Sequence, residues 1–194
     1  MKRFSNHKQR SGNISRWIPW AVVLSLGLGC TGSLDKIGGE INPKSKKYHP
    51  SRYTQNVTEK AAAGELPAII GREGELLSMM AGLATGNVIL LGGTGAGKTA
   101  LVHKLAQQIA GGRAGEFNDR TVVLIDLSRL KDLLDEKDLT PQRVLQFLEL
   151  AMEHWRQERG DQTLFVVDEL QTIVADGDTR FSNALKAFLD KHRG

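Results

Sequence analysis

The chain has 194 residues, which is enough for one well-buried domain with an appendage. Its 26 lysines and arginines against 22 acidic residues give a formal net charge of +4, and the first fifty residues account for the excess. No nucleic-acid partner is therefore expected for the rest of the chain. Because Cys30 is the single cysteine, an intramolecular disulfide, a zinc ribbon and a CxxC redox pair are excluded.

Residues 1–30 have the layout of an export signal. A basic stretch without acids precedes an apolar run over residues 17–29, which ends at Cys30. The run is shorter than the roughly 20 apolar residues that a membrane span needs. The segment from Leu26 to Cys30 resembles a bacterial lipoprotein signal, so lipidation of Cys30 is one expectation. The alternatives are a membrane anchor formed by a short hydrophobic N-terminal helix, and a misassigned start or a buried helix.

Residues 31–64 are rich in glycine, serine, lysine, asparagine and proline, with few large apolar residues and no sustained period. This composition predicts a flexible linker. After residue 65 the sequence becomes periodic. Apolar residues at helical spacing predict a helix over residues 73–85. The predicted domain therefore covers residues 65–194.

Residues 87–110 carry the most informative pattern in the chain. The apolar run Val88–Leu91 predicts a buried strand, and an amphipathic helix follows the next loop. The loop fits G-x-x-x-x-G-K-[ST], a phosphate-binding loop whose backbone N–H groups surround phosphate oxygens at a helix N-terminus. Its lysine should neutralise the β- and γ-phosphates, and its threonine hydroxyl is placed to ligate Mg²⁺. A glycine-rich turn without a ligand is disfavoured by this strand-to-helix context. The predicted nucleotide-binding residues are Gly92, Gly93, Thr94, Gly95, Ala96, Gly97, Lys98, Thr99 and Ala100.

Two further strands are predicted over residues 121–125 and 163–167, with a helix from residue 141 to 155 between them. Strands alternating with helices predict an α/β fold, a P-loop NTPase with a three-layer parallel sheet. The carboxyl ends of parallel strands meet at one edge, so Asp168 and Glu169 should lie beside the phosphate loop. Asp168 is predicted to hold Mg²⁺ and Glu169 to polarise the attacking water. The alternative is that both acids only cap the following helix.

With these motifs in place, residues 66–194 resemble an AAA+ ATPase, and more narrowly the first nucleotide-binding domain of the Clp unfoldases and chaperones. Gly92–Thr99 resembles the Walker A motif of this family and Leu164–Thr172 its Walker B motif. The segment Ile69–Glu73 is similar to the one that wraps the adenine, which implies Ile69 and Ile70 as base-binding residues. The resemblance implies ATP and Mg²⁺ as cofactors.

The chain departs from this family in three respects. Residues 128–139, at the place of the aromatic pore loop, contain no Tyr, Phe or Trp, which argues against substrate threading. The sequence stops soon after Walker B, so the AAA+ large subdomain is expected to be incomplete, with a gap between its first and third strands. A truncated gene product, a strand supplied by a partner and a rearranged sheet are all open explanations. The export-like N-terminus is also foreign to the family.

The favoured interpretation is a Clp-like AAA+ domain that binds ATP, hydrolyses it weakly and couples to protein remodelling. The alternative is a non-catalytic nucleotide-binding scaffold or lipoprotein, or a degenerate AAA+ fragment. A nucleotide or shikimate-type kinase is disfavoured by the acid pair. Besides the nucleotide, the expected partner is a second copy or another AAA+ protein, and the sequence does not specify a client. A bacterial membrane location through the N-terminus is expected, with the ATPase domain on the cytoplasmic side, where ATP is plentiful.

Overall fold

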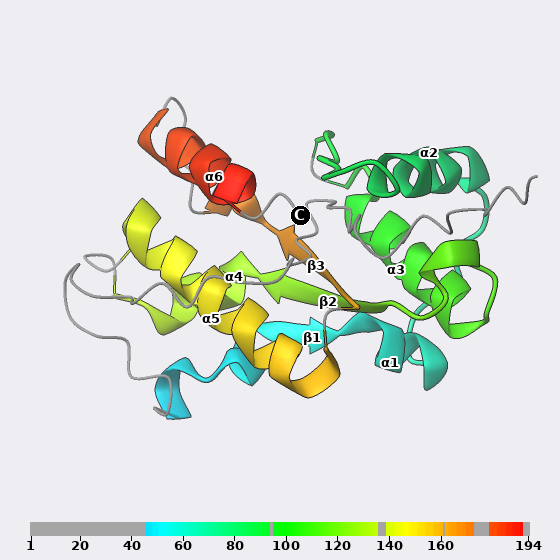
Figure 1. Cartoon of the computed structure of the whole chain (residues 1–194), viewed down its shortest axis with the longest axis horizontal. Helices are drawn as coiled ribbons and strands as arrows, with labels where there is room; N and C mark the ends of the chain where they lie inside the picture. The colour runs from blue at the N-terminus through cyan, green and yellow to red at the C-terminus, as the bar shows by residue number, and fades with distance from the viewer. Residues whose placement is uncertain (1–45, 94, 136–138, 161, 173–178, 192–194) are drawn as a thin grey trace, which may run out of the picture.

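The computed structural model describes residues 46–93, 95–135, 139–160, 162–172 and 179–191 (Figure 1). The predictions for residues 1–45, which include lipidation of Cys30 and the membrane anchor, lie outside these ranges. No helix in the described ranges is both long enough and apolar enough to cross a membrane.

The described residues alternate between strands and helices along most of the chain. The elements are β1 Thr54–Asn56, α1 Val57–Ala62, α2 Glu73–Leu83, α3 Lys98–Ala110, β2 Thr121–Asp126, α4 Leu127–Leu133, α5 Pro141–Arg159, β3 Thr163–Asp168 and α6 Thr179–Lys191. Short 3₁₀ turns cover Lys46–Tyr48, Pro50–Arg52, Gly115–Phe117 and Leu170–Thr172.

The sheet formed by the described residues has the strand order β1-β2-β3. β2 and β3 run parallel and stay in register up to Asp126, which lies opposite Asp168. β1 pairs antiparallel along the other edge of β2, with Thr54 opposite Ile125. The two strands predicted on either side of the long helix are therefore confirmed, and they end side by side.

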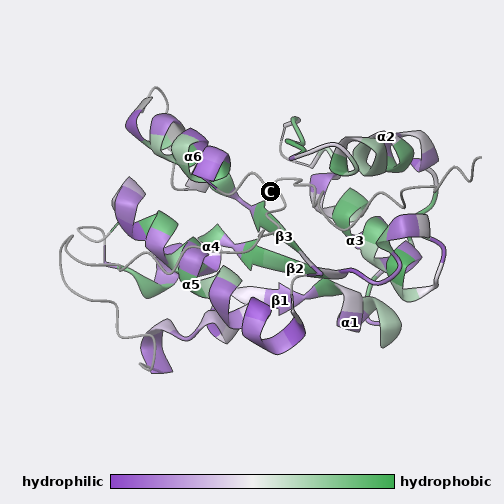
Figure 2. Cartoon of the chain, viewed as in Figure 1, coloured by the Kyte–Doolittle hydropathy of each residue, from purple (hydrophilic) through white to green (hydrophobic). Residues whose placement is uncertain are grey.

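Helices cover both faces of this sheet. Side chains alternate along β2, so Val123 and Ile125 join one apolar core while Val122 and Leu124 join the other. The first core is completed by α4, α5 and α6, and the second by α1, α2 and α3 (Figure 1). β2 and β3 are mostly hydrophobic in Figure 2, as expected for strands buried on both faces. The three-layer α/β architecture is confirmed, although one of the three strands is antiparallel.

The strand predicted at residues 88–91 is absent, and the segment is irregular. Val88 and Leu90 still pack against the core beside α2 and α3. Ile89 and Leu91 are 61% and 89% exposed. The alternation of buried and exposed side chains is that of an extended strand, but a strand also needs a neighbour to satisfy its backbone groups. In the described sheet β3 pairs only with β2, so the predicted strand has no neighbour, and its outer side chains are exposed rather than buried.

The linker prediction is wrong for residues 46–62, which fold onto the domain as β1, α1 and two 3₁₀ turns. Tyr53 is fully buried, and its hydroxyl donates to the carbonyl oxygen of Phe147 on α5 at 3.2 Å. Trp155 of the same helix donates its indole N–H to Thr54 Oγ1 at 2.8 Å. A few anchoring side chains thus hold a segment whose average composition is that of a linker. The linker boundary at residue 64 stays a prediction.

Truncating Tyr53 tests whether this segment belongs to the folded domain. Tyr53→Ala is expected to lower the free energy of unfolding by about 3–5 kcal/mol, the range for a buried aromatic side chain. Tyr53→Phe removes only the hydrogen bond to Phe147 and should cost about 1 kcal/mol. Equilibrium urea unfolding of the full chain measures both. An unchanged midpoint in Tyr53→Ala would show that the segment does not dock.

The docked segment should also make stability depend on pH. His154 on α5 lies with its ring centroid 5.0 Å from that of His49, and burial followed by the charge of His49 lowers the pKa of His154. Because the unfolded chain binds the proton more readily, the stabilisation is present above the unfolded pKa of about 6.5 and is lost as the pH falls below it. The urea midpoint is expected to fall between pH 7.5 and 5.

His154→Gln should make this fall smaller. His103→Gln should also make the fall smaller, because burial, followed by the charge of Lys60 on α1, lowers the pKa of His103 on α3. If His154→Gln follows the wild-type pH profile, the histidine contact does not contribute to docking.

Candidate nucleotide-binding site

The phosphate loop runs from Gly92 into the first turn of α3, which begins at Lys98. Gly95 and Gly97 both have a φ of +79°, a left-handed conformation that glycine adopts without steric cost. Gly97 is also the N-terminal cap of α3. The first N–H groups of a helix have no partner within the helix, so here they are available to an anion at the loop. Thr94 lies outside the described residues.

Lys98 folds its side chain back over the loop. Its Nζ donates to the carbonyl oxygens of Gly92 at 2.8 Å and Gly93 at 3.1 Å. The ammonium is therefore already at the loop, where a phosphate oxygen would compete with two carbonyls for it. Gly92 and Gly93 are themselves exposed, so the loop is open to a ligand from solvent.

Thr99 and Asp168 meet although 69 positions separate them in the sequence. The Thr99 hydroxyl donates to Asp168 Oδ2 at 2.7 Å, and the backbone N–H of Glu169 donates to Asp168 Oδ1 at 2.9 Å. The sequence predicted that the acids after β3 would lie beside the phosphate loop, and this hydrogen bond places Asp168 there.

The donor set at this point suits Mg²⁺. Mg²⁺ prefers oxygen ligands and is usually held by one or two protein groups, with water and substrate phosphate completing its shell. A hydroxyl and a carboxylate in direct contact supply such a pair. In the described part of the chain there is no group of three or more His, Cys, Asp or Glu side chains that could hold a metal ion.

Glu169 has an unusual backbone conformation. Among the described residues, the non-glycine residues with positive φ are Arg72 at 66° and Glu169 at 61°. Side chains make this conformation costly, and it tends to occur at functional sites. The carbonyl of Glu169 accepts hydrogen bonds from the backbone N–H of Thr172 at 2.9 Å and from its hydroxyl at 2.7 Å. A short turn thus fixes the backbone from which the Glu169 carboxylate projects.

Arg72 is a site residue to which the sequence analysis gave no individual role. Its Nη1 donates to the carbonyl oxygen of Gly97 at 2.6 Å, and its Nε lies 3.3 Å from Glu75 Oε1. Arg72 and Lys98 both line a cavity of about 670 Å³ between α2 and residues 88–91. Arg72 has a positive φ of 66°, and sequence patterns do not reveal such a conformation.

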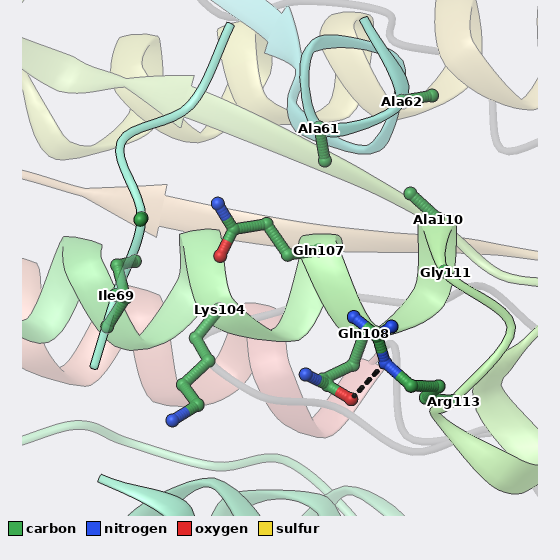
Figure 3. A pocket seen from close by; sticks show the side chains of 10 residues that line it. Ala61, Ala62, Ile69, Lys104, Gln107, Gln108, Ala110, Gly111 and Arg113 are labelled. Carbon is green, nitrogen blue, oxygen red and sulfur yellow. Dashed lines mark hydrogen bonds between the residues drawn. The ribbon is translucent and has the colours of Figure 1, made fainter. Parts of the chain in front are cut away.

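The two predicted adenine-binding residues lie elsewhere. Ile70 is 94% exposed. Ile69 lines a second cavity of about 460 Å³ beside α3, together with Lys104, Gln107 and Arg113 (Figure 3). The structure therefore does not bring Ile69 and Ile70 into the cavity that Lys98 lines.

A loop of this form at a helix N-terminus, with a carboxylate from a neighbouring strand against its threonine, defines a P-loop NTPase domain. The profile of the NACHT domain family matches residues 87–192. The chain belongs to this family, and the match includes the phosphate loop, β2 and β3.

Relatives among characterised proteins are Clp chaperones. The chain is 30% identical over 158 residues to the mitochondrial chaperone protein ClpB4 of Arabidopsis thaliana, which covers 77% of this chain. It is 31% identical over 141 residues to the chaperone protein ClpB of Mycobacterium tuberculosis, covering 71% of this chain. Identity to the chloroplastic chaperone protein ClpC2 of Arabidopsis thaliana is 30% over 161 residues, or 79% of this chain. The chain spans 16% of the length of each. The resemblance to Clp ATPases is thus confirmed.

Gly97→Ala is expected to destabilise the protein more than Gly95→Ala does. Both substitutions place a side chain at a φ of +79°, which costs roughly 1–2 kcal/mol. A Cβ at Gly97 would also displace Nη1 of Arg72 and so break its hydrogen bond to Gly97 O, whereas a Cβ at Gly95 meets nothing within 4 Å. Urea unfolding should show the difference in the wild-type background and lose it in Arg72→Ala. A difference that persists without Arg72 would contradict the contact.

Proposed function

We propose that the chain binds Mg·ATP at the phosphate loop and hydrolyses it slowly. The observation that carries the proposal is the 2.7 Å hydrogen bond from Thr99 to Asp168, because it joins the two segments that hold metal and phosphate in P-loop NTPases. The NACHT match and the Clp relatives support nucleotide binding in general. Hydrolysis, and any coupling to protein remodelling, is the proposed step beyond them.

Each residue of the site has a distinct part in the proposed reaction. Lys98 exchanges the carbonyls of Gly92 and Gly93 for β- and γ-phosphate oxygens. Thr99 and Asp168, which contact each other at 2.7 Å, would hold Mg²⁺, and the bound metal would neutralise charge on the phosphates. Glu169 accepts a hydrogen bond from the attacking water and orients it toward the γ-phosphate.

Faster turnover is proposed to need a second protein. An arginine finger supplied by a partner contributes roughly 10³- to 10⁵-fold to the rate in this class of reaction. A second copy or another AAA+ partner is the proposed source of that group.

The exposed segment at residues 88–91 favours a second candidate function. Ile89 and Leu91 present apolar surface beside the phosphate loop, and the extended backbone has no strand neighbour in the described sheet. A nucleotide-binding scaffold that captures a partner through this segment needs no hydrolysis. Glu169→Gln separates the two functions, since it should abolish phosphate release in an ATPase and leave partner capture unchanged in a scaffold.

Membrane attachment is proposed from the layout of residues 1–30 alone. Lipidation at Cys30, or a short anchor over residues 17–29, would place the ATPase domain at a membrane. Fractionation of the full chain against Cys30→Ser distinguishes the two forms of attachment, because only lipidation needs the thiol.

Binding of Mg·ATP to the full chain tests the nucleotide site by calorimetry. Lys98→Ala is expected to weaken binding at least tenfold, because two or more charged hydrogen bonds to phosphate are lost. Lys131→Ala removes the same charge from an exposed position on α4 and should bind as the wild type does. Equal affinity in Lys98→Ala and the wild type would reject the site.

Glu169→Gln is expected to bind Mg·ATP as the wild type does and to release no phosphate. Replacing the carboxylate by an amide keeps the size of the side chain but removes the acceptor that polarises water. Glu65→Gln, at an exposed residue before α2, is the matched control and should keep wild-type turnover. Phosphate release at the wild-type rate in Glu169→Gln would remove this residue from the mechanism.

A further inference from the structure

One charged side chain lies within the buried face of α3. Lys104 is the one charged residue among the buried residues of this helix, and the others are apolar. Burying an ammonium group is costly unless hydrogen-bond acceptors surround it. A methionine at this position would fill the same space without that cost. Packing alone therefore does not account for a lysine here.

The acceptors that the structure gives Lys104 belong to residues 67–73, which we call the entry segment because they lead into α2. Lys104 Nζ donates to the carbonyl oxygen of Gly71 and, at 2.7 Å, to Glu73 Oε1. The side chain of Glu73 is 72% exposed, so this carboxylate does not need a protein partner to offset burial. The contact therefore ties the entry segment to α3.

A second polar side chain of α3 reaches the same segment. Gln107, one turn after Lys104, donates its Nε2 to the carbonyl oxygen of Pro67 at 3.0 Å. Figure 3 shows both side chains projecting from the helix. The entry segment contains no buried residue and, before α2, no helix or strand. Hydrogen bonds from α3, rather than apolar packing, therefore fix its position.

The entry segment carries Arg72 to the phosphate loop. Arg72 lies between the two residues that Lys104 contacts, and its φ of 66° is costly for a non-glycine residue and persists where the surroundings fix it. Its Nη1 donates to the carbonyl oxygen of Gly97 at 2.6 Å. The same carbonyl accepts the first hydrogen bond of α3, from the N–H of Leu101 at 3.0 Å. Arg72 therefore contacts the loop at the peptide group where the helix begins.

The peptide group between Gly97 and Lys98 connects this contact to the phosphate site. A trans peptide group is planar, with its C=O and its N–H pointing in opposite directions. The position of the Gly97 carbonyl therefore sets the direction of the Lys98 N–H. This N–H is one of those at the start of α3 that have no partner within the helix and are available to a phosphate anion.

We propose that Lys104 is a positioning residue of the nucleotide site. With Gln107 it fixes the entry segment on α3. Through Arg72 the entry segment holds the Gly97 carbonyl, and this carbonyl sets the direction of the Lys98 N–H. The proposal rests on the proposed nucleotide binding, and it adds two residues of α3 that lie outside the phosphate loop.

Lys104→Met tests the proposal, because methionine keeps an unbranched side chain and removes the charge. Calorimetry on the full chain is expected to show Mg·ATP affinity lowered about fivefold or more. The free energy of unfolding in urea should stay the same or rise, because an apolar side chain replaces a buried charge and Glu73 stays solvated. A purely structural lysine would give lower stability and unchanged affinity. Lys104→Arg, which keeps the charge and the donors, should recover most of the affinity.

Two neighbouring glutamines on α3 form a matched pair of variants. Gln107→Ala removes the hydrogen bond to Pro67 and is expected to weaken Mg·ATP binding about threefold. Gln108→Ala removes the acceptor of a 3.3 Å hydrogen bond from Arg113, outside the entry segment, and should bind as the wild type does. Gln107→Ala also keeps the proposal testable if Lys104→Met does not fold, which far-ultraviolet circular dichroism reports.

A double-mutant cycle shows whether Lys104 acts through Arg72. Arg72→Gln is expected to weaken Mg·ATP binding about tenfold, because the loop loses its contact with the entry segment. Adding Lys104→Met to Arg72→Gln should then weaken binding no further. Additive losses would mean that the two residues act independently and would overturn the proposal.

The outcomes separate this inference from the proposed function. If the wild type binds Mg·ATP and Lys98→Ala does not, while Lys104→Met and Gln107→Ala bind as the wild type does, nucleotide binding stands and the positioning role is overturned. If the wild type does not bind Mg·ATP, or if Lys98→Ala binds it normally, nucleotide binding at this loop fails and the inference fails with it.

Discussion

The contact between Thr99 and Asp168 depends on how the strands pair and on how α3 packs against the sheet. Asp168 reaches the edge of the sheet because β3 runs parallel to β2 and in register with it. Thr99 reaches the same point because α3 lies on the sheet with Leu101 and Leu105 buried beneath it. A shift of one residue in either element would turn one of the two side chains away. The hydrogen bond of 2.7 Å therefore forms only when β3 and α3 are packed in this arrangement.

The buried ammonium group of Lys104 holds the segment that contacts the phosphate loop through Arg72. Lys104 is 5% exposed, and a buried ammonium is costly unless carboxylates or carbonyls surround it. Glu73 and the carbonyl of Gly71 supply those partners, and the hydrogen bond from Lys104 lowers the pKa of Glu73. Removing Lys104 would release the segment that holds Arg72 against Gly97. Two residues with a backbone conformation that is costly for side chains are thus close to the loop in space or in sequence: Arg72 contacts Gly97, and Glu169 follows Asp168, which contacts Thr99.

Sequence patterns predicted those features that depend on neighbouring residues in the sequence. The parallel strands, the long helix between them and the meeting of the loop with Asp168 follow from hydrophobic periodicity and from the strand-to-helix context of one motif. The strand expected at residues 88–91 failed because pairing depends on a neighbour, which periodicity cannot supply. Residues 46–62 were read as linker because composition averages over a window, and Tyr53 and Val57 are lone apolar anchors in polar surroundings. Arg72 was passed over because its role depends on a left-handed φ and on Lys104, some thirty positions away.

The docking of β1 along the outer edge of β2 shortens the stretch of chain between residue 30 and the folded domain. If residues 46–62 were free, the chain between Cys30 and the domain could extend over residues 31–64. With these residues committed to the fold, only residues 31–45 separate Cys30 from the first described turn. Fifteen residues span at most about 50 Å when fully extended. Because of this docking, the first described turn lies within about 50 Å of residue 30.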